Sequence, residues 1–401
     1  MDWNDSPEQA AFRAEVLDLI ETRLPDRYKT QAAAGELRER AWETDRKSPD
    51  APARQAAMAW HEALSERGWV APHWPKEYGG AGLSPMEQFI LNQEIARAGA
   101  PGVGGSGVSL LGPTLIVHGT DEQKRRYLPP ILNAEVTWAQ GYSEPGAGSD
   151  LASLQTRAVR DGDDFVINGQ KIWTSAAHTA DAIFALVRTD PDAPKHRGIS
   201  FLLIDDIKTP GISIRPLIDM SDGHYFNEVF FDNVRVPATN LVGELNRGWY
   251  VGMTLLDFER SNIAGAVAAR RTLLRLLDLI RSDDVLRRLA KSRAVQNELA
   301  DRYIETEVMF QYSFRIISMQ ARGEIPNYEA STAKLFNSEL SQRLTQTAVR
   351  CTGLRGGLLS DSGVRSYARS YLGAVPATIR GGTSEVQRNI IATRGLGLPR
   401  D

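Results

Sequence analysis

The hydrophobic pattern of this chain changes its period twice, and this constrains the fold more than any other feature. In residues 6–134, apolar side chains recur at helical spacing, as in the stretch 86–99. In residues 135–237, short segments rich in Val, Ile and Phe replace this pattern, and helical spacing returns from about residue 246. The short segments do not alternate with helices, so the pattern disfavours a parallel doubly wound sheet. It favours a β-barrel or sandwich between two helical regions.

The length of the chain agrees with a division into three parts. A chain of 401 residues is long enough for two to three domains. We expect residues 1–134 to form a helical domain, residues 135–240 a β-barrel domain and residues 241–401 a helical bundle.

Short-range signals predict where some elements begin and turn. Ser6, followed by Pro7 and with Gln9 three positions later, predicts a capping box at the start of the first helix. Three dipeptides predict tight turns in the β region: Asp161-Gly162, Asn168-Gly169 and Asp222-Gly223.

Composition and charge exclude several classes of function. The formal net charge is −3, so no basic excess attracts nucleic acid or an anionic membrane. Cys351 is the single cysteine and the six histidines are scattered, which excludes a disulfide framework and predicts no metal site. No stretch is long and apolar enough to span a bilayer, and acidic residues stand where a signal peptide needs basic ones. We expect a cytoplasmic protein that binds neither nucleic acid nor a membrane.

One pattern typical of dinucleotide binding, GxGxxG, occurs at residues 102–107. A helical pattern and Pro101 precede it, whereas a dinucleotide site requires a strand at that place. We therefore interpret this segment as a flexible loop. The chain has no GxSxG, HExxH or P-loop pattern, so the usual signals of hydrolases and metalloenzymes are missing.

Two neighbouring segments have the chemistry of a ligand site. In residues 141–150 the glycines allow backbone N–H groups to approach a ligand closely, and Ser143 and Ser149 add hydroxyl donors. Further along, Trp173 is followed two positions later by Ser175, and on a strand both side chains would share one face. Such a face would offer an aromatic wall and a hydrogen bond to a flat heterocycle.

Four ordered motifs resemble those of the acyl-CoA dehydrogenase family. They are GYSEPGAGSDLASLQT from Gly141, NGQKIWTS from Asn168, LDFER from Leu256 and IRGGTSEVQRNII from Ile379. Their order resembles bacterial members, such as the pimeloyl-CoA dehydrogenase large subunit and the steroid-side-chain dehydrogenases. The resemblance implies a mostly α-helical fold with a central β-barrel and a C-terminal four-helix bundle. It also implies FAD in the cleft between barrel and bundle, with an acyl-CoA thioester on one flavin face.

The resemblance carries cofactor contacts onto ten residues of this chain: Gln140, Tyr142, Ser143, Ser149, Trp173, Ser175, Arg350, Gly353, Thr383 and Glu385. Ser149 also faces the CoA side, and Ser175 lies near flavin N5. The family often has a glutamine and a double glycine that contact the FAD of a neighbouring subunit. This chain has RCTGLRGG at residues 350–357 instead, where the Arg350 guanidinium still matches a pyrophosphate. The family's RxxFG element has no counterpart near residues 287–293.

The reaction that the resemblance implies needs a base to remove the α-proton of the thioester. Many family members carry this glutamate in a terminal IYEGT motif, where the present chain has Gly381. A minority, including isovaleryl-CoA dehydrogenase-like enzymes, carry it on the first helix of the bundle, where this chain has Glu259. An isolated helix glutamate is more often solvated, but with Gly381 at the other position we expect Glu259 to be the base.

Three further residues fall on substrate positions of the family. The Gly381 backbone N–H is expected to donate to the thioester carbonyl, and Asp257 and Arg260 match positions near the CoA. For Arg260 a second interpretation stays open, in which it pairs with a carboxylate inside the bundle.

The predicted function is FAD-dependent oxidation of an acyl-CoA to a trans-2-enoyl-CoA. The proton would pass to Glu259, the hydride to flavin N5 and the electrons to an electron-transferring flavoprotein. We expect either a homotetramer or an α2β2 assembly with a second acyl-CoA dehydrogenase chain. Two alternatives are an acyl-CoA oxidase that uses O₂ and a flavin-poor partner subunit of a heteromeric dehydrogenase. The acyl group stays open among straight, branched, dicarboxylic and steroid side chains.

Overall fold

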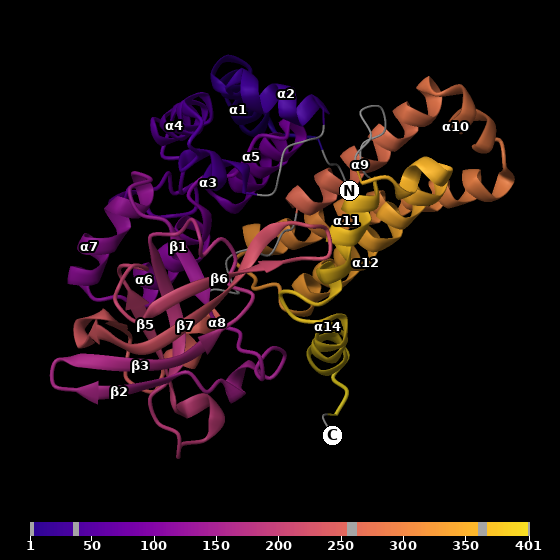
Figure 1. The fold of residues 1–401 in the computed structure, drawn as a ribbon. Helices are drawn as coiled ribbons and strands as arrows, with labels where there is room; N and C mark the ends of the chain where they lie inside the picture. Colours follow the sequence, from indigo (N-terminus) through magenta and orange to yellow (C-terminus); the bar gives the residue numbers. More distant parts are fainter. Residues whose placement is uncertain (1–3, 35–39, 255–262, 360–366, 400–401) are drawn as a thin grey trace.

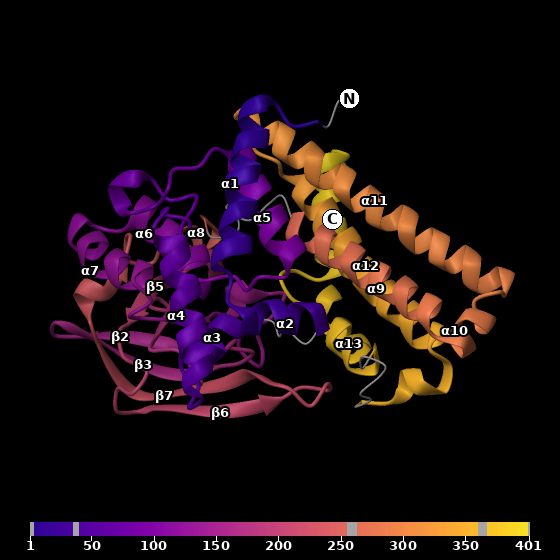
Figure 2. The same cartoon turned by 90° about the horizontal axis from the view of Figure 1, so that it is seen from above.

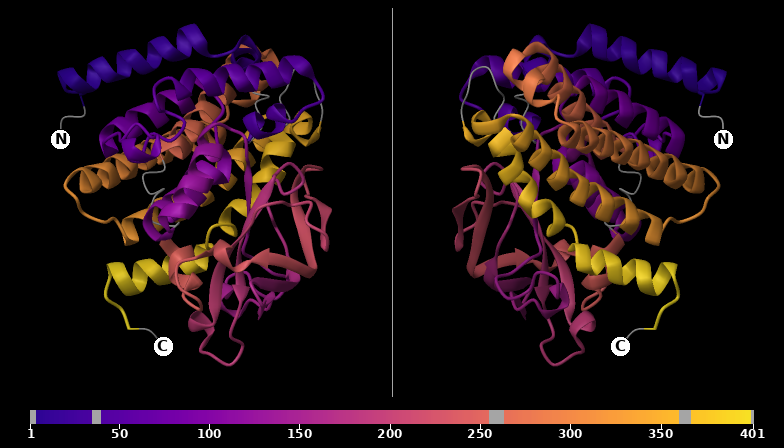
Figure 3. Two further views of the ribbon diagram at one scale, coloured as in Figure 1. Left: turned by 90° about the vertical axis from the view of Figure 1, so that its left-hand side faces the viewer. Right: turned by 90° about the vertical axis from the view of Figure 1, so that its right-hand side faces the viewer.

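Along the chain, helices come first, a set of strands follows, and helices return after them (Figure 1). The structure, a computed structural model, describes residues 4–34, 40–254, 263–359 and 367–399. In both views of Figure 3 the strands gather at one end of the molecule, and helices from both parts of the chain lie together at the other. This arrangement of helical, β and helical parts confirms the predicted fold class.

The N-terminal part consists of short and medium helices that begin with strong caps. Ser6 caps the first helix as predicted: its hydroxyl accepts from the Gln9 N–H, and the Gln9 side chain accepts from the Ser6 N–H. Ser84 and Thr120 form the same capping box at the starts of α5 and α7. The helices of this part are α1 (Pro7–Arg23), α2 (Asp26–Ala34), α3 (Ala41–Arg46), α4 (Ala51–Ser65), α5 (Pro85–Ala98), α6 (Gly112–His118) and α7 (Asp121–Leu132).

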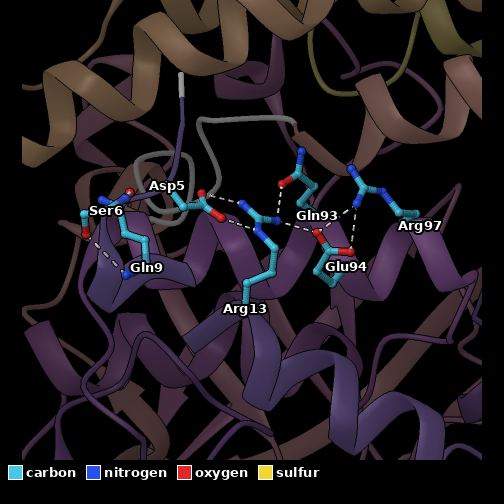
Figure 4. A network of polar contacts seen from close by, with 7 residues as sticks. All are labelled: Asp5, Ser6, Gln9, Arg13, Gln93, Glu94 and Arg97. Atoms are coloured by element: carbon cyan, nitrogen blue, oxygen red, sulfur yellow. Dashed lines mark hydrogen bonds and ion pairs between the residues drawn. The ribbon is translucent and has the colours of Figure 1, made fainter. Parts of the chain in front are cut away.

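Arg13 fastens α1 to α5 (Figure 4). Its guanidinium donates to Gln93 at 2.7 Å, pairs with Glu94 on the same helix, and pairs with Asp5 at 2.6 Å. The Glu94 side chain is fully buried and also pairs with Arg97, one turn further along α5, at 3.2 Å. A buried carboxylate needs such partners because an unpaired charge in the interior carries a large desolvation cost. The network thus orients α5, which packs on α1 and also on the C-terminal helices.

The strands form one mostly antiparallel sheet with the order β6-β7-β3-β2-β4-β5-β8, and β1 pairs in parallel with β4. All of β5 and all but the last residue of β4 are buried, because these strands are covered on both faces. Alternate residues pack against the N-terminal helices and against the other strands. The strands are β1 (Trp138–Gly141), β2 (Arg157–Asp161), β3 (Asp164–Lys171), β4 (Ala182–Arg188), β5 (Ile199–Ile204), β6 (Ile212–Ile218), β7 (His224–Pro237) and β8 (Leu241–Val242).

Two of the three predicted turns are confirmed. Asp161-Gly162 connects β2 to β3, and Asp222-Gly223 lies between β6 and β7. The turn predicted at Asn168-Gly169 is wrong, because both residues lie inside β3 where the register with β7 shifts at a bulge. Gly169 has a φ of 147°, and a Cβ there would lie 2.7 Å from the Thr156 backbone. The glycine permits this close approach of two chain segments.

The C-terminal part is a bundle built on three long helices, α9, α11 and α12, which lie side by side (Figure 2). Their apolar core includes Phe89 of α5. Arg369 donates to the Ser221 carbonyl at the tip of the β6–β7 hairpin at 2.7 Å, so the bundle also touches the sheet. The helices of this part are α8 (Gly248–Thr254), α9 (Ile263–Ser282), α10 (Asp284–Leu289), α11 (Arg293–Ala321), α12 (Tyr328–Cys351), α13 (Tyr367–Ala374) and α14 (Ser384–Ile390).

The domain boundaries after residues 134 and 240 stay a prediction. In secondary structure, α7 ends at Leu132 and the last strand, β8, ends at Val242. Among the described residues, no helix is both long and apolar enough to cross a lipid bilayer. In the same part of the chain, no three His, Cys, Asp or Glu side chains are grouped so that they could hold a metal ion.

Candidate functional site

The glycine-rich segment that follows β1 is fixed from its inner side by Glu144. The Glu144 carboxylate accepts hydrogen bonds from the backbone N–H groups of Gln155 at 2.6 Å and Thr156 at 2.9 Å. On the outer side, apart from the adjacent residues of the chain, no described atom lies within 4 Å of the positions that a Cβ of Gly146 or Gly148 would occupy. The segment therefore has an anchored inner side and an open outer side.

Lys171, the last residue of β3, joins the second predicted segment to the first. Its side chain is fully buried, and its ammonium pairs with Glu144 at 2.7 Å and donates to the Tyr142 carbonyl at 3.1 Å. The Ile172 N–H donates to the Ser143 carbonyl at 2.9 Å. Burial opposes ionisation of Glu144, but Lys171 and the two backbone amides outweigh it and hold the pKa of Glu144 below its usual value. The two predicted segments therefore lie against each other.

None of the four residues predicted in the first segment is fully buried. Ser149 is exposed, and Gln140 and Ser143 are half-buried, as is the fourth residue, Tyr142. Next to Ser149, Asp150 pairs with Lys195 at 2.7 Å on the surface, where such a pair contributes little stability. The accessible hydroxyl and amide groups can bind the polar edge of a heterocycle or a phosphate.

The fourth residue, Tyr142, turns its ring into the core of the β domain. The ring packs edge-on against Phe184 and Phe201, with centroids 6.1 and 6.4 Å away. The hydroxyl is buried, and burial raises the pKa of this phenol. A ligand on the outer side of the segment would therefore meet the Tyr142 backbone rather than its ring.

The prediction that Trp173 and Ser175 share one face of a strand is wrong. The strand β3 ends at Lys171, and Trp173 has a φ of 59°, a left-handed conformation that is uncommon for residues other than glycine. The Trp173 side chain is 56% exposed and contacts Phe226 edge-on, with centroids 5.8 Å apart. An aromatic surface is thus present, but a turn rather than strand alternation presents it.

The turn that carries Trp173 is held by Asn227 of β7. The Asn227 side chain is fully buried, and its amide donates to the Thr174 carbonyl at 3.0 Å. The same amide group contacts His178 at 3.2 Å and His224 at 3.0 Å, and the two imidazole rings stack with centroids 3.9 Å apart. This cluster links the turn to the β6–β7 hairpin.

These groups fit a flat, hydrogen-bonding heterocycle such as the isoalloxazine ring of FAD. The Thr174 hydroxyl is buried and has no hydrogen-bond partner among the described residues, and a buried polar group in that state indicates a partner still to be supplied. The exposed ring of Trp173 is its neighbour in the chain. An exposed aromatic face next to polar groups is suited to a planar ring with hydrogen-bonding edges.

The predicted residues of the last motif form a separate group at the start of α14. Thr383 caps this helix by accepting from the Val386 N–H at 3.2 Å, and the exposed Glu385 pairs with Arg388 at 3.4 Å. Gly381 has a φ of 65°, and no described atom lies within 4 Å of the position of a Cβ there. The segment therefore presents a helix N-terminus and an open glycine.

Within one chain, Arg350 and Gly353 lie far from this group at the start of α14. Lys334, near the start of α12, donates to the Gly382 carbonyl, whereas Arg350 lies sixteen residues further along the same helix. At 1.5 Å per residue this is a separation of roughly 24 Å along the helix axis. The Arg350 side chain is exposed and pairs with Glu298 at 2.7 Å.

Three predicted residues, Asp257, Glu259 and Arg260, lie outside the described residues. Their roles stay predictions.

In the GxGxxG pattern, residues 102–104 form a loop as predicted, but residues 105–107 are already helical, and Gly107 begins the helical segment Gly107–Leu111. The pattern follows α5 rather than a strand. A Cβ on Gly105 would lie 2.2 Å from the Glu43 carboxylate, and one on Gly104 would lie 2.2 Å from Val108. Close packing therefore accounts for these two glycines without a ligand.

Sequence reasoning missed the groups that hold the candidate site together: Glu144, Lys171 and Asn227. A signal existed for Lys171, because it continues the alternation of Phe165 and Ile167, both of which are buried in β3. A lysine at an inward-facing position must find a buried partner. For Asn227 the signal was absent, since its partners in the turn, Thr174 and His178, lie 53 and 49 residues away in the chain.

A cavity of about 590 Å³ lies elsewhere, between α11 and α12. None of the described candidate residues lines it. Its lining residues are Tyr303, Ile304, Glu307, Val308, Gln311, Tyr312, Arg315, Tyr328, Glu329 and Thr332.

Comparison with known proteins gives a consistent result along the whole chain. Three family models match: the N-terminal domain of acyl-CoA dehydrogenase at residues 6–135, the middle domain at residues 139–234 and the C-terminal domain at residues 246–396. The chain is 41% identical to the acyl-CoA dehydrogenase IpdE1 of Mycobacterium tuberculosis over 350 residues, which cover 86% of this chain and 88% of that protein.

Two solved structures have the same fold along their whole length. The steroid ACAD Tcur3481-Tcur3483 superposes with a TM-score of 0.84 at 34% identity, covering 100% of both chains. The ChsE4-ChsE5 complex from Mycobacterium tuberculosis superposes with a TM-score of 0.82, also at 34% identity and with 100% of both chains covered.

Proposed function

The chain belongs to the acyl-CoA dehydrogenase family, and from this premise we propose that it binds FAD and oxidises an acyl-CoA thioester to the trans-2-enoyl-CoA. The observation that carries the proposal is the buried contact of Lys171 with Glu144 and Tyr142, which brings the two predicted flavin-contact segments together. When bound, FAD would take the hydride from the β-carbon at N5 and pass the electrons to an electron-transferring flavoprotein.

The chain's own residues would bind and orient the reactants. Trp173 would cover one part of the flavin ring, and Ser175 would donate a hydrogen bond near N5. Gln140 and Ser143 would bind the polar edge of the ring system, and Ser149 would contact the CoA side. The accessibility of these side chains supports the assignment, because each is exposed or half-buried.

We assign removal of the α-proton to Glu259. The glycine at position 381 supports this assignment, because it supplies no side chain that could accept a proton. A carboxylate in a site closed to water would have a raised pKa, which suits a base that works near neutral pH.

Residues of the C-terminal part of the chain would make the remaining substrate and cofactor contacts. The Gly381 N–H would donate to the thioester carbonyl and stabilise the negative charge that develops there. Asp257 and Arg260 would lie near the CoA, and Thr383 and Glu385 near the adenine end of FAD.

We propose that the site is completed by a second chain. Arg350 lies roughly 24 Å along α12 from Lys334, at 1.5 Å per residue, and Lys334 contacts Gly382 of the last motif. Arg350 and the nearby Gly353 therefore suit the adenine end of a neighbouring site. The assembly would be a homotetramer or an α2β2 complex with a related chain. Similarity to the ChsE4-ChsE5 complex supports an assembly of that kind.

We further propose an acyl-CoA with a steroid-derived acyl group as the substrate class. The support is the 34% identity over the full length to a steroid ACAD. A panel of straight-chain, branched, dicarboxylic and steroid-side-chain acyl-CoAs tests this directly.

The decisive experiment is anaerobic titration of the purified, FAD-saturated protein with that panel. We expect the protein to be yellow and its flavin absorbance to bleach with at least one acyl-CoA. If the purified chain never binds added FAD, the proposal that an assembly of this chain alone is a dehydrogenase is contradicted.

The same material separates the two alternatives. Peroxide production during aerobic turnover without an added acceptor would identify an oxidase. A colourless chain that forms a stable complex with a second dehydrogenase chain would identify a partner subunit, which the exposed Arg350 stretch and the heteromeric structural neighbours favour over the oxidase.

A further inference from the structure

We propose that Lys171 and Glu144 form a positioning pair that sets the geometry of the flavin ring site. This inference rests on the proposed FAD-binding function. Neither side chain is exposed to the site, so the pair would act through the residues that flank it in the two segments.

The first step of the argument is the set of atoms that the pair connects. The Lys171 ammonium binds the Glu144 carboxylate at 2.7 Å and the Tyr142 carbonyl at 3.1 Å. The carboxylate in turn accepts from the N–H groups of Gln155 at 2.6 Å and Thr156 at 2.9 Å. Three stretches of backbone, at the end of β3, after β1 and before β2, thus meet at one pair of charges.

The second step is the place of the pair in the chain. Trp173 stands two residues after Lys171, and Ser143 stands between Tyr142 and Glu144. The Ile172 N–H donates to the Ser143 carbonyl at 2.9 Å, so the two segments continue in contact on the way to the site. A displacement of Lys171 would therefore move both Ser143 and Trp173, which face the proposed ring from different segments.

The third step is the kind of interaction. Removing two charges from water is costly, so apolar side chains of similar volume would hold two segments together at least as strongly. An ion pair differs from such packing because its hydrogen bonds have a required direction and length. In this pair the bonds end on backbone atoms, so they fix the path of the chain as well as its proximity.

The same segment offers a matched control. Lys195 pairs with Asp150 at 2.7 Å, the same distance as the buried pair, but both side chains are about 60% exposed, at 60% and 61%. Replacing this lysine removes an ion pair from the same loop without disturbing buried backbone contacts.

The test compares Lys171→Met, Glu144→Gln and the control Lys195→Met. For each protein, FAD affinity is measured by flavin fluorescence, and the visible circular dichroism of the bound flavin is recorded at saturating FAD. We expect Lys171→Met to raise the Kd for FAD at least about tenfold, because a buried hydrogen-bond partner is worth that factor or more. We also expect a changed flavin spectrum, since the ring would lie in an altered site.

Glu144→Gln keeps the size of the side chain and an acceptor oxygen, so it reports on the pair even if Lys171→Met does not fold. We expect the same changes in smaller degree. Lys195→Met should keep the Kd within about twofold and leave the spectrum unchanged, as expected for an exposed pair. Lys171→Arg, which retains the charge and several donors, should recover part of the wild-type spectrum.

The spectrum separates positioning from simple stabilisation. Buried-pair variants that melt at lower temperature but bind FAD with the wild-type Kd and spectrum would overturn the inference. Wild-type protein that does not bind FAD would instead remove the proposed function on which the inference rests. If the wild-type protein binds FAD and the buried-pair variants show the same Kd and flavin spectrum, the inference falls but the proposed function stands.

Discussion

Thr174 and Asn227 exchange two backbone hydrogen bonds, of 3.0 and 3.1 Å, beyond the end of the regular β3–β7 ladder. The Asn227 amide adds a third bond of 3.0 Å to the Thr174 carbonyl. Together these bonds hold the turn in which Trp173 adopts a left-handed backbone conformation. The exposed indole ring thus depends on a residue that lies wholly inside the protein.

Asn227→Leu should therefore disturb both the fold and the indole ring. Leucine keeps the volume of the side chain but cannot donate to the Thr174 carbonyl or bond the two stacked imidazoles. We expect a loss of about 1–3 kcal/mol in the free energy of unfolding, the cost of a buried polar group without its partner. Urea denaturation measures this loss.

Asn168→Leu is the matched control on the neighbouring strand. Asn168 is exposed, and within the described part of the chain its side chain bonds only with Asn233, at 2.9 and 3.2 Å. Its replacement should change the free energy of unfolding by no more than about 0.5 kcal/mol. Equal losses in the two variants would contradict a special role of Asn227.

Arg13→Met should destabilise the N-terminal part of the protein. The change leaves the buried Glu94 carboxylate with Arg97 as its remaining cation, and it removes the link between α1 and α5. We expect a loss of about 3 kcal/mol, at the lower end of the range found when one partner of a buried pair is removed. Arg23→Met is the control, because its pair with Glu66 lies on the surface, where an ion pair contributes little stability.

The fold followed from the sequence because its strongest signals are local. The capping box of Ser6 and Gln9 needs only neighbouring residues, and the change of hydrophobic period is visible in short windows. The turn assigned to Asn168-Gly169 was wrong because the same dipeptide suits a bulge, where Gly169 meets the Thr156 backbone. A turn and a bulge at this dipeptide can be distinguished only when the pairing of β3 with β7 is known.

The site was less accessible to sequence reasoning because its geometry depends on distant partners. A two-residue spacing gave the wrong conformation for Trp173, since the hydrogen bonds that fix the turn come from Asn227. The contacts of Lys171 with Glu144 join residues 27 positions apart in the chain. Motif similarity located these segments, but the contacts that join them appear only in three dimensions.

His73 should make stability depend on pH in the mildly acidic range. Burial lowers the pKa of His73 from 6.5 to about 4, and its Nε2 has no hydrogen-bond partner among the described residues. As the pH falls, the His73 side chain therefore binds a proton near pH 6.5 in the unfolded chain but only near pH 4 in the folded chain. This contribution to stability is complete above pH 6.5, falls as the pH decreases, and is lost at about pH 4.

The total loss from His73 would be up to about 3 kcal/mol, at 1.36 kcal/mol for each pKa unit. His73→Leu removes the titration, so the stability of the variant should fall less between pH 7.5 and pH 4.5 than that of the wild type. Urea midpoints at several pH values measure the difference, and carboxylates that titrate in both proteins cancel in it. Parallel pH profiles would show that His73 titrates normally in the folded protein.

Arg350→Met should weaken FAD binding in the assembled protein. In the proposed assembly the guanidinium reaches the pyrophosphate of a neighbouring chain's FAD, and a hydrogen bond to a charged group is worth about 1.5–3 kcal/mol. The Kd for FAD should therefore rise about tenfold or more, while light scattering shows an unchanged assembly. Arg355→Met is the control from the same stretch, because Arg355 pairs with Asp283 at 2.8 Å. Unaltered FAD affinity in Arg350→Met would assign Arg350 to its pair with Glu298 alone.

Glu259→Gln should abolish reduction of the flavin by acyl-CoA and leave binding of FAD and acyl-CoA largely intact. The amide has nearly the shape of the carboxylate, so packing is retained, but it cannot accept the α-proton. Loss of a general base lowers the rate about 10²–10⁴-fold, which anaerobic stopped-flow absorbance measures directly. Flavin reduction at close to the wild-type rate would place the base elsewhere.

Moving the carboxylate tests whether positions 259 and 381 serve one reaction centre. In Glu259→Gly/Gly381→Glu, the new side chain has room, since no described atom lies within 4 Å of the Cβ position at Gly381. The φ of 65° at that residue opposes the change, because a left-handed conformation costs a non-glycine residue about 1–2 kcal/mol. We therefore expect a partial recovery of flavin reduction relative to Glu259→Gly alone, together with a slightly lower melting temperature. A folded, FAD-loaded double variant that reduces its flavin no faster than Glu259→Gly would show that a carboxylate at 381 does not reach the substrate α-carbon.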